Sequence, residues 1–174
     1  MNSSENVTPE NIPQGIAEYA RKIDHVAIAV RDLEKSIIFY ARLGFALTER
    51  MTTRGSESGM VSAVMMAGPV KFVLLQGTDE NSQITRFINE FGPGAQHIAI
   101  EVENCEAVCD ALESNGLPFN TKIIKGPGLT QRFTQRCPES GVMLEFIERN
   151  ETTEGFSEQN VSDLFKQLED NDTF

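Results

Sequence analysis

The alternation of apolar and polar residues predicts a strand, a helix and three further strands early in the chain. Residues 23–30 are rich in Val, Ile and Ala, which is typical of a buried or half-buried strand. Apolar residues at helical spacing then predict a helix over residues 33–43, with Asp32 as its N-cap and Gly44 after its end. The pattern next predicts strands near residues 45–51, 60–67 and 70–76, and a short linking helix at 82–91.

The second half of the chain shows the same order of elements. The pattern predicts a strand at 96–102, a helix at 104–115 that stops at Gly116, and strands near 119–124, 130–137 and 142–149. Beyond Gly155, apolar residues at helical spacing predict an amphipathic C-terminal helix over residues 157–169. Residues 1–21 are polar and contain prolines, which predicts a flexible N-terminal arm.

A direct comparison of the two halves indicates an internal duplication. His25 falls on His97 at an offset of 97 − 25 = 72, and the same offset superposes Gly44 on Gly116 without a gap. We therefore expect an α+β fold in which two tandem βαβββ modules, residues 22–80 and 94–150, form an open half-barrel. With the C-terminal helix they would make one domain over residues 22–174.

Composition restricts the possible partners. The chain has 174 residues, a formal charge of −11 and a sequence pI near 4.6, which argues against nucleic acid because phosphate binding needs clustered basic residues. No apolar stretch reaches the roughly 20 residues of a membrane span, and no signal peptide is visible. With three cysteines, a disulfide framework is not expected, and we expect a cytoplasmic protein.

The duplication also brings together residues that can bind a metal. His25 and His97 occupy the same position in the two modules and are the only histidines of the chain. The spacing 145 − 97 = 48 places Glu145 at the position that Val73 takes in the first module, because 25 + 48 = 73. Two imidazoles and one carboxylate with open positions are the facial triad of non-haem Fe(II) oxygenases, whereas a fourth side-chain ligand would suit Lewis-acid isomerisation.

Each of these residues also has an ordinary interpretation. A single strand histidine is more often a hydrogen-bonded core residue than a ligand, and only the paired positions together with Glu145 favour a metal site. Glu49 and Glu101 could also face the cavity, but they are interpreted as solvent-facing strand residues.

The chain resembles the vicinal oxygen chelate superfamily, and within it the C-terminal catalytic domain of the 4-hydroxyphenylpyruvate dioxygenase family. The resemblance runs from Ile23 to Glu169. It rests on Ile-Asp-His ending at His25, Gly-Pro-Gly-Ala-Gln-His-Ile-Ala over residues 92–99, Leu-Thr-Gln-Arg-Phe-Thr over 129–134, Leu-Glu-Phe-Ile-Glu-Arg over 144–149, and a Gly-Phe tail at Gly155.

This resemblance implies an Fe(II) site at His25, His97 and Glu145, and a 2-oxo acid and O2 as substrates. It further implies a substrate pocket whose lining residues are Ser62, Gln96, Gln131, Phe133 and, on a closing C-terminal segment, Phe156, with Gln83 in support. The family's pocket Asn is replaced by Leu75, which makes that wall more apolar. The family's N-terminal barrel has no counterpart here, and we therefore expect a homodimer that covers the open sheet.

Two other functions remain open. One is a metal-dependent epimerase of the methylmalonyl-CoA epimerase type, in which Glu49 could act as the base. Val73 argues against this function, because that group usually has a fourth metal ligand at this position. The other is a metal-free small-molecule binding protein.

Overall fold

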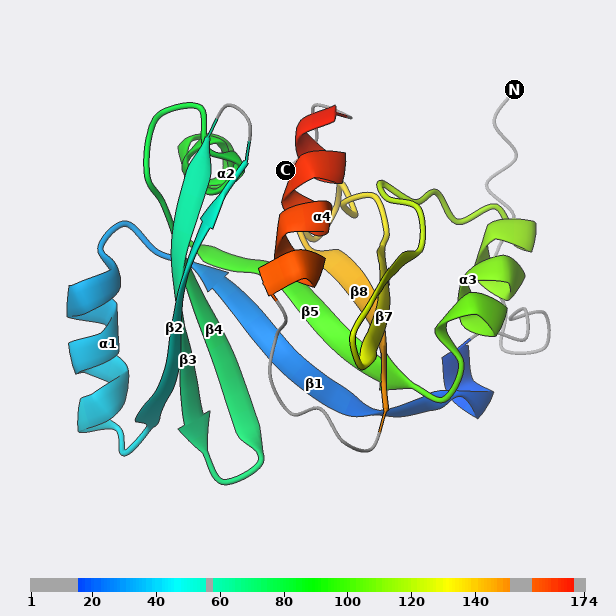
Figure 1. The fold of residues 1–174 in the computed structure, drawn as a ribbon, viewed down its shortest axis with the longest axis horizontal. Helices are drawn as coiled ribbons and strands as arrows, with labels where there is room; N and C mark the ends of the chain where they lie inside the picture. Colours follow the sequence, from blue (N-terminus) through cyan, green and yellow to red (C-terminus); the bar gives the residue numbers. More distant parts are fainter. Residues whose placement is uncertain (1–15, 56–57, 151–157, 171–174) are drawn as a thin grey trace.

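A computed structural model describes residues 16–55, 58–150 and 158–170 of the chain. Figure 1 shows one strongly curved sheet, with α1 (Leu33–Arg42) and α3 (Cys105–Ser114) on its outer side and α4 (Glu158–Asp170) across its concave side. The eight strands of the described residues run in the order β2-β3-β4-β1-β5-β8-β7-β6. This arrangement confirms the predicted α+β half-barrel.

The elements follow the predicted duplication. The first module contains β1 (Ala20–Ala29), α1 (Leu33–Arg42), β2 (Ala46–Arg54), β3 (Gly59–Ala67) and β4 (Val70–Gly77). The second contains β5 (Gly94–Val102), α3 (Cys105–Ser114), β6 (Ile124–Gly126), β7 (Leu129–Phe133) and β8 (Met143–Arg149). A short 3-10 helix, η1 (Ile16–Glu18), precedes β1, α2 (Gln83–Phe91) links the modules, and α4 (Glu158–Asp170) follows them.

The two modules join along β1 and β5, which pair antiparallel at the centre of the sheet. On its other side β1 pairs in parallel with β4, and Ala27 lies beside Val73. In the second module β5 pairs in parallel with β8, and Ala99 lies beside Glu145 in the same way. The pairing therefore gives Val73 and Glu145 the equivalent positions that the offset of 72 predicts.

The module helices begin and end where the sequence predicts. The Asp32 side chain accepts a hydrogen bond from the Lys35 backbone N–H at 3.0 Å, as expected of an N-cap at α1. The chain leaves α1 through Gly44, whose φ of 96° is a conformation that glycine adopts without strain. The buried face of α1, Leu33 and Ile37, packs on Leu74 of β4 and so covers the convex side of the sheet.

Two predicted strands in the second module were wrong in extent. Over residues 119–124 the chain makes only an isolated bridge at Phe119, and β6 starts at Ile124. The Thr121 hydroxyl accepts a hydrogen bond from the Phe133 backbone N–H, so a side chain occupies a β7 donor that a neighbouring strand would use. β7 itself ends at Phe133, and beyond it residues 137–141 form a turn closed by a hydrogen bond from the Gly141 N–H to the Cys137 carbonyl.

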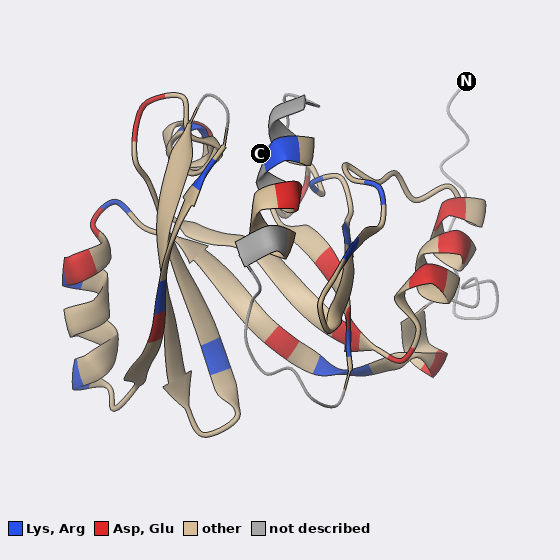
Figure 2. Ribbon diagram, viewed as in Figure 1, with Lys and Arg blue, Asp and Glu red and all other residues tan. Residues whose placement is uncertain are grey.

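The described part of the predicted arm is ordered. Residues 16–18 form η1, and β1 starts at Ala20, where it pairs with Val102 of β5. Figure 2 marks the charged residues along the ribbon, among them the acidic residues of α3, which are Glu106, Asp110 and Glu113. Each helix within the described ranges is too short or too polar to cross a bilayer.

Candidate metal centre and substrate cavity

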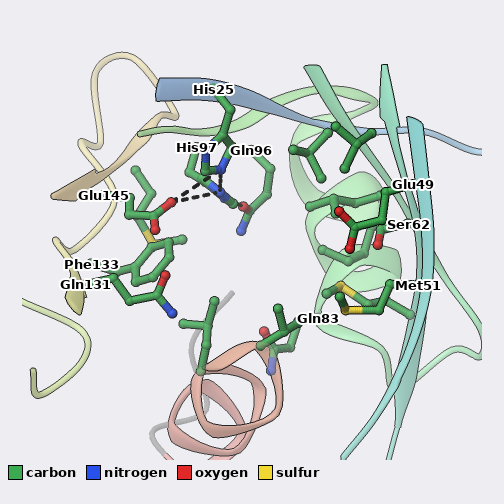
Figure 3. A pocket seen from close by; sticks show the side chains of 18 residues that line it. His25, Glu49, Met51, Ser62, Gln83, Gln96, His97, Gln131, Phe133 and Glu145 are labelled. Carbon is green, nitrogen blue, oxygen red and sulfur yellow. Dashed lines mark hydrogen bonds and ion pairs between the residues drawn. The ribbon is translucent and has the colours of Figure 1, made fainter. Parts of the chain in front are cut away.

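The concave side of the sheet forms an open cavity, and the empty space in it, together with the solvent at its mouth, is about 780 Å³. Strands from both modules form its walls, and Val161 and Leu164 of α4 close one side (Figure 3). Most of the lining is apolar, which is typical of a ligand pocket with a few placed polar groups. The polar side chains that line it are His25, Glu49, Ser62, Gln83, Gln96, His97, Gln131 and Glu145.

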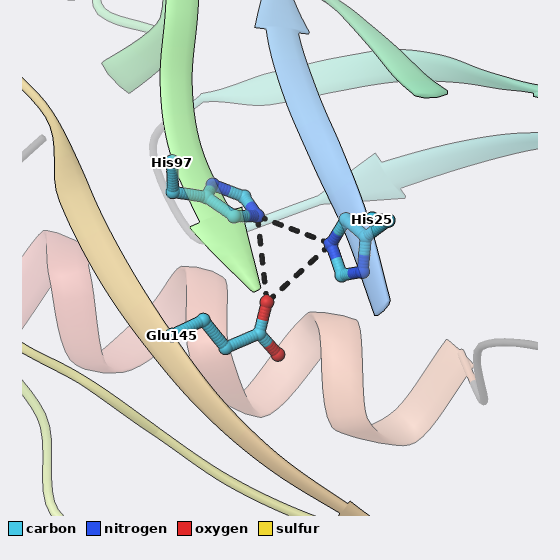
Figure 4. Close-up of side chains that lie close together, drawn as sticks. All are labelled: His25, His97 and Glu145. Atoms are coloured by element: carbon cyan, nitrogen blue, oxygen red, sulfur yellow. Dashed lines mark hydrogen bonds and ion pairs between the residues drawn. The ribbon is translucent and has the colours of Figure 1, made fainter. Parts of the chain in front are cut away.

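His25, His97 and Glu145 meet at one end of this cavity (Figure 4). The Nε2 atoms of the two histidines are 3.3 Å apart. The Glu145 Oε2 atom lies 3.4 Å from His25 Nε2 and 3.5 Å from His97 Nε2. The three residues are at most 8% exposed, so their donor atoms form a buried, nearly equilateral triangle.

The other nitrogen of each imidazole is committed to a neighbouring oxygen. His25 Nδ1 lies 2.7 Å from the Asp24 carboxylate, and His97 Nδ1 contacts the Gln96 amide oxygen. Because both partners are acceptors, each Nδ1 carries the proton and donates it, and each neutral ring presents an Nε2 lone pair. Two lone pairs and a carboxylate oxygen that face one another repel, unless a proton or a cation lies between them.

Burial shifts the pKa of each of these groups in the direction that favours its neutral form. It lowers the pKa of His25, although the hydrogen bond to Asp24 opposes this, and it lowers the pKa of His97 well below the usual value. Burial, together with the charge of Asp24, raises the pKa of Glu145 to about 8. Without a cation the histidines are therefore neutral at pH 7 and Glu145 is largely protonated.

The donor set fits a divalent metal ion. A cation bound at about 2.1 Å separates adjacent ligands by about 3.0 Å in octahedral and about 3.4 Å in tetrahedral geometry, close to the spacings found here. The Glu145 Oε1 atom is buried and has no hydrogen-bond partner among the described residues, so this carboxyl is not satisfied by protein groups alone. Two imidazoles and one carboxylate suit Fe(II), Mn(II), Co(II) and Zn(II).

A charged cluster that the sequence did not suggest supports His25 from behind. Asp24 is 5% exposed and accepts two hydrogen bonds from Arg149, at 2.6 Å and 3.0 Å. Lys71 lies 3.5 Å from the same carboxylate. Although burial opposes it, the hydrogen bonds from His25 and Arg149 hold the pKa of Asp24 well below its usual range. Asp24 is therefore a buried anion that fixes the ring orientation of His25.

The residues named from the resemblance take up different places around the cavity. Ser62 and Leu75 line the wall formed by the first module, whereas Gln96, Gln131 and Phe133 line the half that carries the triad. The Phe133 ring packs edge-on against His97, with ring centroids 5.3 Å apart. Gln83 also lines the cavity, and Phe156 lies outside the described residues.

The sequence interpretation preferred a solvent-facing position for Glu49 over the cavity-facing alternative. In the structure Glu49 is half-buried and faces the cavity from β2 (Figure 3). Alternation along β2 puts Glu49 and Met51 on one face, a signal that could have identified it. Glu101 does not line the cavity and pairs with Lys22 at 3.3 Å.

Comparison with known families gives a match over residues 22–146 to the one described as Glyoxalase/Bleomycin resistance protein/Dioxygenase superfamily. Among curated proteins, 4-hydroxyphenylpyruvate dioxygenase of Pseudomonas aeruginosa is 27% identical over an alignment of 186 positions, gaps included, that covers 85% of this chain and 52% of that protein. The mitochondrial methylmalonyl-CoA epimerase of Homo sapiens is 38% identical over 107 residues, 60% of this chain and 59% of that protein. The chain thus spans little more than half the length of these relatives.

Two solved structures superpose on this chain, a 4-hydroxymandelate synthase and a methylmalonyl-CoA epimerase. A triple mutant of 4-hydroxymandelate synthase from Streptomyces coelicolor superposes with a TM-score of 0.75 at 22% identity, over 88% of this chain and 55% of that chain. Methylmalonyl-CoA epimerase from Mycobacterium tuberculosis superposes with a TM-score of 0.65 at 26% identity, over 80% of this chain and 93% of that chain. The first likeness concerns the fold alone.

Proposed function

The chain belongs to the glyoxalase/bleomycin resistance protein/dioxygenase superfamily, and from that membership we propose that it is an Fe(II)-dependent dioxygenase acting on a 2-oxo acid. The observation that carries the proposal is the composition of the four equivalent positions. Three hold His25, His97 and Glu145, and the fourth holds the hydrocarbon Val73. A three-ligand set leaves the open positions that chelation of a 2-oxo acid and binding of O2 together require.

The triad residues would hold the metal, which when bound supplies a Lewis acid and a redox centre for oxidative decarboxylation coupled to hydroxylation. Two neutral imidazoles and one carboxylate leave a divalent ion with a local charge near +1, which attracts an anionic substrate in spite of the acidic chain. Asp24 and Gln96 keep the two imidazoles oriented with Nε2 toward the site.

The cavity walls would orient the organic part of the substrate and exclude water. Phe133 offers a flat apolar face beside His97, and Gln131 offers an amide on the same wall. Val161 and Leu164 cover the cavity from α4, so this helix acts as a lid in the proposed reaction. The expected homodimer and the cytoplasmic location stay predictions.

A metal-dependent epimerase of the methylmalonyl-CoA epimerase type is the second candidate. The 38% identity to the human epimerase supports it, and so does Glu49, which faces the triad across the cavity where a base that removes a substrate proton could stand. Val73 argues against it, because a hydrocarbon at the fourth position supplies no further ligand.

The experiment that tests the proposal is a parallel assay of anaerobically purified, Fe(II)-loaded protein. Oxygen consumption with a panel of aryl and alkyl pyruvates supports the dioxygenase. Solvent deuterium incorporation into a 2-methyl acyl thioester without oxygen consumption supports the epimerase. Ligand binding that survives complete removal of metal, with neither reaction, supports a metal-free binding protein and overturns both.

A further inference from the structure

The two ends of the cavity differ in chemistry. The triad occupies one end, and the opposite wall is formed by β2 and β3, where the Glu49 carboxylate and the Ser62 hydroxyl face the cavity beside Met51 (Figure 3). A substrate that binds a metal through one end therefore presents its other end to Glu49.

Among the described residues, no basic side chain forms an ion pair with Glu49. Its sequence neighbour Arg50 lies on the other face of β2 and makes two hydrogen bonds with Glu34, at 2.5 Å and 2.9 Å. Lys71 and Arg149 are committed to Asp24 behind the triad. The half-buried Glu49 carboxylate thus has no basic counter-ion within the described ranges.

The rest of the lining reinforces this asymmetry. In the part of the chain that the structure describes, no Lys or Arg lines the cavity. Apart from Glu49, the polar groups at the end of the cavity remote from the triad are the neutral side chains of Ser62 and Gln83. Apolar walls weaken the screening of charge by water, so an anion near Glu49 is repelled and a cation is attracted more strongly than at an open surface.

We infer that the Glu49 end of the cavity selects substrates with a protonated nitrogen, an ammonium or guanidinium group, remote from the group that binds the metal. The part of the inference that concerns the 2-oxo acid end rests on the proposed function. The site consequently discriminates against 2-oxo diacids, whose second carboxylate would meet Glu49 with no cation to bind it.

Three phenylpyruvates that differ only at the para position test this inference. They carry an aminomethyl, an ethyl or a carboxymethyl group, so that charge changes while the size stays similar. Their dissociation constants are measured anaerobically by calorimetry with the full chain, with and without Mn(II). We expect the aminomethyl compound to bind about tenfold more tightly than the ethyl compound and the carboxymethyl compound to bind most weakly.

The variant Glu49→Gln should reduce the preference for the ammonium group to within about twofold while Mn(II) affinity and the melting temperature stay unchanged. Glu103→Gln is the matched control, because Glu103 is an exposed residue paired with Arg21 and its loss changes the net charge equally. This control should keep the full preference.

The possible results separate the inference from the proposed function. Binding that depends on Mn(II) but shows no preference for the ammonium group overturns the inference and leaves the function standing. A preference for the ammonium group without dependence on Mn(II) supports the inference and counts against the function. Equal, metal-independent binding overturns both. The wild-type series decides these cases even if the Glu49 variant does not fold.

Discussion

Replacing Asp24 by asparagine is expected to weaken divalent metal binding about 10–100-fold, although Asp24 does not face the triad. The carboxylate accepts the Nδ1 hydrogen of His25 at 2.7 Å and thereby fixes the ring orientation and raises the basicity of Nε2. An asparagine of the same shape can still accept this hydrogen bond but lacks the charge. The loss should therefore appear in metal affinity before it appears in the position of His25.

The same substitution affects stability, and the two effects can be separated. It leaves Arg149 and Lys71 beside a neutral group, and breaking a buried ion pair in this way costs about 3–5 kcal/mol. Adding Arg149→Met removes one of these two positive charges. The double variant should recover part of the stability but none of the metal affinity.

Competition with a chromophoric chelator measures Mn(II) or Zn(II) affinity, and paramagnetic NMR of the Co(II)-loaded protein resolves the exchangeable Nδ1 protons of His25 and His97. Only the His25 signal should move in the Asp24 variant. Asp32→Asn is the matched control, because this half-buried N-cap is equally well formed by asparagine. A folded Asp24 variant whose metal affinity lies within twofold of the wild type would refute the reasoning.

Three further predictions concern Glu145 and the contact that holds α4. Because burial raises the pKa of Glu145 from 4.5 to about 8, folding disfavours its ionised form, so its contribution lowers the stability of the metal-free protein as pH rises between these values. Glu145→Gln should then stabilise the metal-free protein at pH 8 by on the order of 2–4 kcal/mol, measured by urea unfolding, and a loss of stability would contradict the raised pKa. The same variant should show no metal-induced rise in melting temperature. Metal binding to the wild type should release about one proton at pH 6.5 and almost none at pH 9, measured by calorimetry in buffers of different ionisation enthalpy, and equal release at both would argue against the raised pKa. Since a Cβ at Gly126 would overlap the Asn160 side chain, Gly126→Ala should increase hydrogen exchange in α4. The same substitution should have little effect once Asn160→Ala is present, and additive effects of the two substitutions would show that this contact does not hold α4.

The fold and the triad could be predicted because duplication gives the same information twice. One histidine in an apolar strand says little, but His25 and His97 at one offset, with capped helices and turn glycines in the same register, define a module and its position in the sheet. The spacing from His97 to Glu145 then identifies the third ligand candidate, and the pairing of Ala27 with Val73 matches that of Ala99 with Glu145. The spacing of residues carries this information because the geometry of the backbone decides on which face of a strand or helix each side chain lies.

The features that could not be predicted depend on side-chain contacts that do not follow the alternation of residues along a strand. Simple alternation would put Asp24 on the face opposite His25, but the pairing of β1 with β5 has an irregularity between Ile23 and His25, and the Asp24 carboxylate reaches the imidazole. The wrong strand over residues 119–124 has a similar cause, because the Thr121 hydroxyl takes the N–H of Phe133. Neither contact has a periodic signal in the sequence.

The positions where the two modules differ explain why the centre is asymmetric. Asp24 and Gln96 are equivalent by the offset of 72, and each holds the Nδ1 of its own histidine, one with a charged and one with a neutral acceptor. Val73 and Glu145 are equivalent as well, so the first module places its carboxylate behind the histidine and the second places its carboxylate in front. Each module thus contributes one buried acid, but only one of the two can reach a metal, and His25 becomes the more strongly polarised donor. A symmetric copy of either module would give two or four front ligands, and the three-ligand set arises only from this divergence.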